Sequence, residues 1–287
     1  MATCGPRAAV NPPFRPPSRI GLVAAARELG QGRPMVGGVE FDYEAGAAAV
    51  GSVDPYADHT KSITESADTV QWDPFLIWTG EACSTFGGSQ EESFETARLR
   101  LIRQTSHKVE EVVWTNLVDG TAYNTGSAHP NIGLANSGAT QLNSGTATGI
   151  VTAFSNMIMA LADDLGSERG MIHVDARLLP FLSFYGLVVR EGNLLLTALA
   201  DHIVVAGTGY TGSAPDAPET PLTSTTSWIY GTGIVELALS DVYGTQYTDP
   251  ETNTVEARAE RAVLASWDTN THYAALACIP DPGPDCP

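Results

Sequence analysis

The chain has 287 residues, of which 43% are hydrophobic, and this is enough apolar material for a sizeable core in one large domain or in two intertwined ones. Its 33 acidic and 15 basic residues give a formal net charge of −18, which argues against a nucleic-acid binder, because phosphate affinity comes from clustered lysine and arginine. No run of 18 apolar residues predicts a membrane span, and the proline- and arginine-interrupted N-terminus is unlike a signal peptide.

The first 88 residues are predicted to be extended. Residues 1–40 contain the stretch NPPFRPPSR and are expected to form an arm, because proline fixes φ and withholds a hydrogen-bond donor from any sheet. Such an arm is either disordered or laid on a neighbouring molecule. Residues 41–88 follow as short β-like pieces, such as DPFLIWTG, separated by polar turns.

The clearest local signal is a long helix. Ser89 and Glu92 form a capping box, and the predicted helix runs to about residue 116. An apolar stripe at steps of three and four residues predicts that one narrow face is buried. The members of this stripe are Phe94, Ala97, Leu101, Thr105, Val109 and Val112.

The remaining elements alternate between helices and strands. A second helix is predicted over residues 147–165, ended by Gly166, after an irregular stretch rich in glycine, asparagine, serine and threonine. A buried strand over 171–174, a short helix that Pro180 kinks, and two pairs of strands within 193–207 and 228–242 complete the middle. The predicted class is therefore α+β.

Residues 255–268, VEARAERAVLASWD, carry conflicting signals. Alanine, arginine and glutamate favour a helix, whereas the alternation of apolar residues favours a strand. The turn-like DPETNT before this stretch and the β-like HYAALACIP after it favour the strand. Glu256, Arg258 and Glu260 would then form one polar face, and Val263, Ala265 and Trp267 would face the core at the strand's end.

No motif predicts catalysis, and neither a cofactor nor a metal is expected. The glycine-rich GTGYTG at 207–212 is followed by proline-rich sequence and not by the helix that a dinucleotide site requires, so it predicts a turn between strands. An enzyme acting on a small molecule remains an alternative, with His173, Asp201 and His202 as its only candidate site. The four cysteines, Cys4, Cys83, Cys278 and Cys286, are expected to be unpaired thiols, with a Cys4–Cys286 link as the alternative.

Three arginines on the long helix are candidates for subunit contacts. Arg98, Arg100 and Arg103 lie away from the apolar stripe in a strongly acidic chain. They are either a solvated helix face, in which Glu95 lies near Arg98, or partners for acidic groups of a neighbouring subunit.

The order of these features resembles the major capsid protein of tailed bacteriophages, the Hong Kong 97-type fold. The resemblance rests on the block FLIWTGEACSTFG, FETARLRL and VEEVVW, and on the terminal WIYGTGIVELALSDV and TVEARAERAVLASWD segments, which together cover about two thirds of the chain. It implies a non-enzymatic protein that self-assembles into pentamers and hexamers of an icosahedral head around double-stranded DNA. An encapsulin-like shell, which shares the fold, is the alternative.

The resemblance also implies a division of the chain and a set of partners. Residues 1–40 would be the N-terminal arm, 41–88 the extended loop region, 89–146 the peripheral domain with its spine helix over 89–117, 147–240 the axial domain, and 241–287 the return to the peripheral sheet. Expected partners are further copies of the chain and scaffold, portal and decoration proteins. No sequence-specific DNA contact and no membrane is expected, and the protein would reside in the virion after assembly in the host bacterial cytoplasm. The candidate contact residues are Arg98, Arg100, Arg103, Glu256, Arg258 and Glu260.

Overall fold

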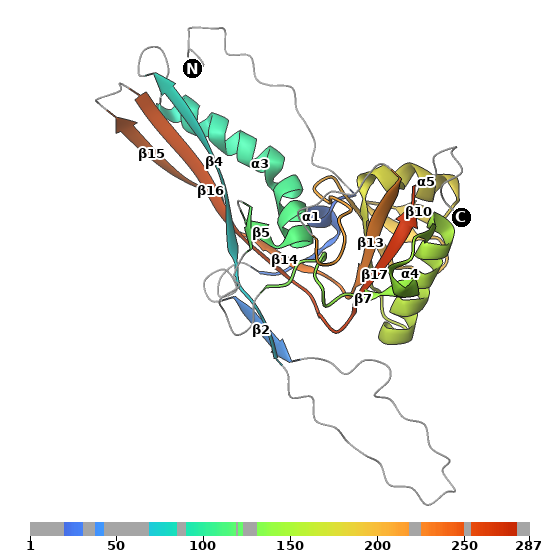
Figure 1. Cartoon of the computed structure of the whole chain (residues 1–287). Coiled ribbons are helices and arrows are strands. Elements are labelled where there is room, and N and C mark those ends of the chain that lie inside the picture. Colours follow the sequence, from blue (N-terminus) through green and yellow to red (C-terminus); the bar gives the residue numbers. More distant parts are fainter. Residues whose placement is uncertain are drawn as a thin grey trace, which may run out of the picture.

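The computed structural model describes residues 20–30, 38–42, 69–84, 90–118, 120–122, 131–217, 225–249 and 254–279. Most of the predicted N-terminal arm and extended loop, together with Ser89 of the capping box, lies outside these ranges. The described residues form an elongated helix-and-sheet layer joined to a more compact unit (Figure 1). No described helix is long and apolar enough to cross a membrane.

The elongated layer consists of the long helix α3 on one face of a five-stranded sheet. The sheet has the order β1-β14-β16-β15, with β4 paired to the other side of β16. Its elements are β1 (Arg27–Glu28), β4 (Phe75–Ser84), α3 (Gln90–Thr115), β14 (Glu236–Leu239), β15 (Tyr243–Asp249) and β16 (Thr254–Ser266). Five members of the predicted apolar stripe of α3 are buried and Phe94 is half-buried, so the helix prediction is confirmed.

Residues 254–266 form a strand, as the alternation predicted. The strand β16 pairs antiparallel with β4 on one side, and with β15 and then β14 on the other. Ala257 and Ala259 are at most 1% exposed, while Glu256 and Arg258 are exposed on the opposite face. Tertiary pairing therefore overrides the helix propensity of this segment.

The compact unit is an eight-stranded sheet covered by two helices. Its strand order is β10-β11-β12-β9-β13-β17-β7, with β8 also paired to β17. Its strands are β7 (Thr140–Gln141), β8 (Thr148–Gly149), β9 (Met171–Asp175), β10 (Val188–Glu191), β11 (Leu194–Thr197), β12 (Ile203–Gly207), β13 (Thr226–Thr232) and β17 (His272–Cys278). Helix α4 (Ile150–Leu165) ends at Gly166 as predicted, and α5 (Leu179–Phe184) has Pro180 in its first turn, where proline begins a helix and does not kink it.

Several short elements complete the described structure. Helix α1 lies at the start of the described chain, the hairpins β2–β3 and β5–β6 follow β1 and α3, and two 3₁₀ turns flank α4 and precede α5. Their bounds are α1 (Leu22–Ala25), β2 (Val39–Asp42), β3 (Thr69–Trp72), β5 (Leu117–Val118), β6 (Thr121–Ala122), η2 (Leu142–Gly145) and η3 (Ala176–Leu178).

Three expectations require correction. The last strand, β17, pairs with β13 in the eight-stranded sheet, so residues 241–287 do not all return to the sheet beside α3. Conversely, β14 lies in that five-stranded sheet although it falls within 147–240. Cys278 forms a disulfide, so the prediction of unpaired thiols is wrong for this residue. The proposed Cys4–Cys286 link lies outside the described residues.

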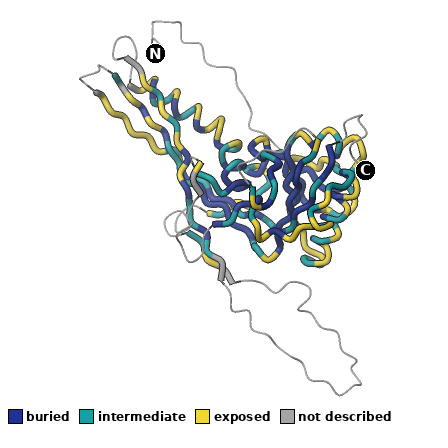
Figure 2. Tube along the Cα trace, viewed as in Figure 1, coloured by how far each residue is buried: buried dark blue, intermediate teal, exposed yellow. Residues whose placement is uncertain are grey.

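The two sheets share one apolar core. A single cluster of buried side chains runs from the inner face of the five-stranded sheet, through α3, to one face of the eight-stranded sheet. Trp114 at the end of α3 is fully buried, stacks edge-on against Tyr230 and donates its indole N–H to Ser213. A second cluster lies between α4 and the opposite face of the eight-stranded sheet. Buried residues accordingly concentrate where the two layers meet (Figure 2).

A buried carboxylate ties three segments together at this junction. Glu110 of α3 is 1% exposed. One of its oxygens accepts from the Leu22 N–H at 3.0 Å and the Ser106 hydroxyl at 3.1 Å, and the other from the Gly209 N–H at 3.0 Å and the Thr208 hydroxyl at 3.4 Å. Carboxylates that accept several backbone N–H bonds satisfy groups that are costly to bury alone. Glu110 therefore fixes α1, α3 and the loop after β12 relative to one another.

The GTGYTG stretch belongs to this junction. At Gly209, a Cβ atom would overlap the His107 carbonyl of α3, so only glycine lets the loop approach the helix backbone this closely. Gly212 has φ of 70°, in the left-handed region that favours glycine. The predicted turn is confirmed, and the glycines are there to pack the loop against α3 and Ser227.

We expect Glu110→Ala to destabilise the protein strongly. The substitution leaves the Leu22 and Gly209 N–H groups buried without their acceptor, at a cost of about 1–3 kcal/mol for each group. Thermal denaturation of the purified protein measures the loss. The neighbouring Glu111→Ala is the control, because Glu111 is partly exposed and, within the part of the chain that the structure describes, forms an ion pair only with Lys108. Equal melting temperatures for the two variants would contradict this role of Glu110.

Candidate functional site

The candidate arginines of α3 have different surroundings. Arg98 donates two hydrogen bonds to Glu95, one turn away, at 2.8 and 3.1 Å. This hydrogen bond lowers the pKa of Glu95 and raises that of Arg98. Arg100 reaches across to β4, where it bonds to Glu81 and to the Gly80 carbonyl. Both arginines therefore form ion pairs with acidic side chains of their own subunit.

Arg103 is the exception among these three residues. Its side chain is exposed and makes no hydrogen bond or ion pair with the described part of the chain. A guanidinium left in water on a rigid helix retains its five donors for a carboxylate of another molecule. Of the three candidates, Arg103 is therefore the one best placed to bind a partner.

The mixed-charge residues of β16 lie on the face of the five-stranded sheet turned away from α3, here called the open face. Arg258 pairs with Glu260 at 3.3 Å, and its guanidinium lies 4.8 Å from the ring centre of Trp78 on β4. Glu256 is exposed on the same face. Because side chains alternate along β16, Glu256, Arg258 and Glu260 all lie on this face.

Sequence analysis missed the aromatic residues of the open face. Trp78 on β4 is 52% exposed, and Tyr243 and Tyr247 on β15 are 62% and 63% exposed. Alternation within FLIWTG and YGTQYTD was the available signal, because it places these rings at period two on the same side as Glu256 and Glu260. Large aromatic side chains left in water on a sheet face are typical of contact surfaces.

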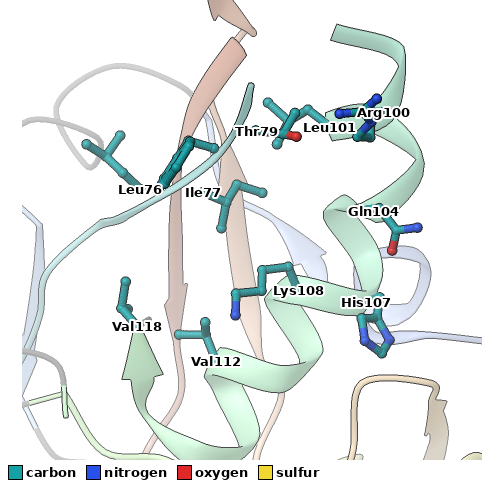
Figure 3. Close-up of a pocket in the computed structure, with 11 residues that line it drawn as sticks. Leu76, Ile77, Thr79, Arg100, Leu101, Gln104, His107, Lys108, Val112 and Val118 are labelled. Atoms are coloured by element: carbon teal, nitrogen blue, oxygen red, sulfur yellow. The ribbon is translucent and has the colours of Figure 1, made fainter. Parts of the chain in front are cut away.

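A second surface feature is a groove between α3 and the free edge of β4. It encloses about 300 Å³ and is lined by apolar residues from β4, α3 and β5, with Arg100, Gln104, His107 and Lys108 at its rim (Figure 3). Within the described residues, β4 pairs only with β16, so its other edge faces this groove. The groove is suited to apolar side chains or to an extended segment rather than to a charged small molecule.

The candidate enzyme site is not assembled. Asp201 is exposed and pairs with Arg169, whereas His173 is fully buried and its two ring nitrogens contact the Tyr210 and Thr232 hydroxyls at 3.0 and 2.9 Å. His202 is also buried, and its Nδ1 accepts the Gly170 N–H at 3.0 Å. These histidines are structural. The described residues also contain no cluster of three or more potential metal ligands.

Burial makes these histidines sensitive to acid. It lowers the pKa of His173 to about 3, with a further contribution from the charge of His272. Burial also lowers the pKa of His202 and of His272. A neutral buried histidine binds fewer protons than the same residue in the unfolded chain, so its stabilising effect is complete above its unfolded pKa of about 6.5 and is lost as the pH falls below that value.

We therefore expect the free energy of unfolding to fall between pH 7 and pH 5, a range in which carboxylates titrate little. His173 alone contributes a slope approaching about 1.4 kcal/mol per pH unit below 6.5. Urea denaturation at several pH values measures it. His173→Gln should flatten the slope, whereas His107→Gln, on the exposed side of α3, should leave it unchanged. A pH-independent stability of the unsubstituted protein over this range would refute the prediction.

The folded chain is similar to chains of solved phage, GTA-capsid and encapsulin structures over nearly its whole length. A chain of Mycobacterium phage Ogopogo matches with a TM-score of 0.55 and 13% identity, covering 95% of this chain and 96% of that one. The capsid of the native GTA particle matches with a TM-score of 0.51 and 12% identity, over 96% and 95%. The holo-SrpI encapsulin complex from Synechococcus elongatus PCC 7942 matches with a TM-score of 0.51 and 9% identity, over 93% and 91%.

Neither a family model nor a curated protein sequence matches the chain. At these identities the similarity is one of fold, and it spans both the α3 layer and the eight-stranded unit. This chain therefore has the α+β fold of the Hong Kong 97-type capsid and shell proteins, which confirms the fold that its sequence resemblance predicted.

Proposed function

We propose that this protein is the repeating subunit of a closed protein shell and, more specifically, the major capsid protein of a tailed bacteriophage. On this proposal it assembles as pentamers and hexamers into an icosahedral head around double-stranded DNA. The observation that carries the proposal is the end-to-end match to a phage chain, which leaves only 5% of this chain and 4% of that one uncovered.

The proposal assigns a place to each layer. Helix α3 and the five-stranded sheet would form the peripheral domain, with α3 as its spine. The eight-stranded sheet with α4 and α5 would form the axial domain, around the five-fold and six-fold axes. Within residues 1–40 and 41–88, the parts other than α1, β1 and β4, which pack within the subunit, would supply the arm and the extended loop that reach neighbouring subunits. Scaffold, portal and decoration proteins would be further partners, and the protein would reside in the virion after assembly in the host cytoplasm.

The charge of the chain supports a DNA-filled shell. A net charge of −18 repels the phosphate backbone, so DNA would stay mobile inside the particle and would not adsorb to its wall. The protein would hold DNA by enclosure, without contacts to particular bases.

The candidate contact residues would act between subunits. Arg103 would pair with a carboxylate of the adjacent copy, while Glu256, Arg258 and Glu260 would offer a mixed-charge face to another. Arg98 and Arg100 would serve chiefly within the subunit, because Glu95 and Glu81 already bind them. The groove beside β4 would accept apolar side chains from a neighbour.

An encapsulin-like compartment is the second candidate, because an encapsulin chain shares the fold over 93% of this chain. The two differ in what they enclose. Particles purified from the natural source should contain double-stranded DNA if the protein is a phage capsid, and a protein cargo if it is a compartment shell.

We expect the purified protein to form closed particles of megadalton mass, alone or when produced with its neighbouring gene products. Size-exclusion chromatography and negative-stain electron microscopy check this. A protein that stays a monomer or dimer at all concentrations and in the presence of those products would contradict the shell function.

We further expect Arg103→Gln to weaken assembly more than Arg98→Gln. The first change removes a cation that has no partner among the described residues of its own subunit, whereas the second removes one that Glu95 already neutralises. The concentration at which particles form should rise by several-fold for Arg103→Gln, as expected for a charge-assisted contact repeated over the shell. Melting temperatures of the unassembled subunits should be similar for both variants. Equal assembly of the two would count against an inter-subunit role for Arg103.

A further inference from the structure

The open face carries aromatic residues in a regular arrangement. Tyr243 on β15 is the register partner of Glu260 on β16, and Glu260 is the register partner of Trp78 on β4. These three side chains therefore form a row across the sheet, with a carboxylate between two rings. A parallel row, four residues away on each of these two strands, joins Tyr247 to Glu256 through the same kind of pairing.

The spacing within the row suits one kind of ligand. Two inter-strand steps separate Trp78 from Tyr243, and each step is about 4.8 Å, so the two positions are roughly 9.6 Å apart. One turn of a polyproline II helix contains three residues and rises about 9.3 Å. Prolines three residues apart therefore match the two rings, and aromatic surfaces are the usual docking sites of such helices.

The N-terminal segment has this composition. Residues 11–19 read NPPFRPPSR, with Pro13 and Pro16 three residues apart and Arg15 between them. Residues 1–19 contain three arginines and no acidic residue, in a chain whose overall charge is −18. The segment thus complements both the rings and the glutamates of the open face.

We propose that residues 11–19 of one copy bind across the open face of a second copy as a polyproline II helix, with Pro13 and Pro16 over Trp78 and Tyr243 and with Arg15 beside Glu260. The inference rests on the proposed function only in requiring a neighbouring copy. A second copy is needed because Ile20, where the segment enters the fold, bonds to β12, and α1 packs on α3, the side of the sheet opposite the open face.

Arg258 orients two residues of this site and leaves the site accessible to a ligand. Its guanidinium lies over Trp78 and pairs with Glu260, which fixes the indole and the carboxylate, yet half of Trp78 remains exposed. The charges of Glu256 and Glu260 outnumber that of Arg258, so the face retains a net attraction for an arginine-bearing segment.

Photo-crosslinking of the full chain tests the proposal. Phe14→p-benzoylphenylalanine places the reactive group inside the segment. Equal amounts of ¹⁵N-labelled and unlabelled copies are mixed, assembled and irradiated, and mass spectrometry identifies the crosslinked peptides. We expect crosslinks between labelled and unlabelled copies, to peptides that contain β4 or β15.

Substitution of the two aromatic residues tests whether they form the binding site. Trp78→Ser combined with Tyr243→Ser should lower the yield of these crosslinks by about tenfold, as for the loss of anchor residues at other interfaces. Tyr185→Ser is the matched control, because Tyr185 is similarly exposed but lies after α5 in the other layer. Crosslinks confined to one copy, crosslinks to other regions, or an undiminished yield in the double variant would each overturn the proposal.

The outcomes separate this inference from the shell function. Particles whose segments crosslink elsewhere would remove the inference and leave the shell function standing. A protein that never assembles would remove the shell function, and the docking would then be decided by fluorescence anisotropy of a labelled peptide of residues 8–20 added to the unassembled protein. Saturable binding that the double variant weakens supports the docking, and no binding overturns it.

Discussion

The constraint on which this fold depends is the burial of one face of α3 on the five-stranded sheet and of its C-terminal end, at Trp114, against the eight-stranded unit. Neither layer forms a complete core alone, because the inner face of the five-stranded sheet and one face of the eight-stranded sheet contribute, together with α3, to the same apolar cluster. Apolar burial is not directional, so it brings the layers together without fixing their angle. The hydrogen bonds of Glu110 and the close approach of Gly209 supply that direction.

Apolar burial holds the layers together and a few hydrogen bonds orient them, so the interior contains few polar groups. His173, His202 and the indole of Trp114 bond to hydroxyl or backbone groups and present no reactive atom to solvent. The open face and the groove beside β4 lie outside this interior, where side chains are left to meet other molecules. The side chains available to other molecules therefore lie on the open face and in the groove, not in the interior.

Sequence patterns predicted the elements with strong local signals. Helix α3 followed from its apolar stripe, and β16 followed from alternation in spite of its helix-forming composition, because alternation reports which side chains a sheet can bury. The pairing of β17 with β13 could not be predicted, since two apolar strands near the C-terminus suit either sheet equally. The disulfide of Cys278 was also missed, because spacing alone does not reveal which cysteines meet in space. Among the candidate contact residues, sequence placed Glu95 near Arg98 on the same helix, but it could not reveal that Arg100 binds Glu81, which lies on a strand that only the fold brings beside α3.

The position of Glu110 near one end of α3 has a mechanical consequence. About 20 residues of the helix extend beyond it toward Gln90, a length of roughly 30 Å, and most of the five-stranded sheet lies along that length. A rotation of only about 10° at this joint would displace the far end of the layer by roughly 5 Å over that distance. Since Glu110 holds this end of α3 to α1 and to the loop after β12, the orientation of the far end of the layer depends on contacts made at this end of the helix.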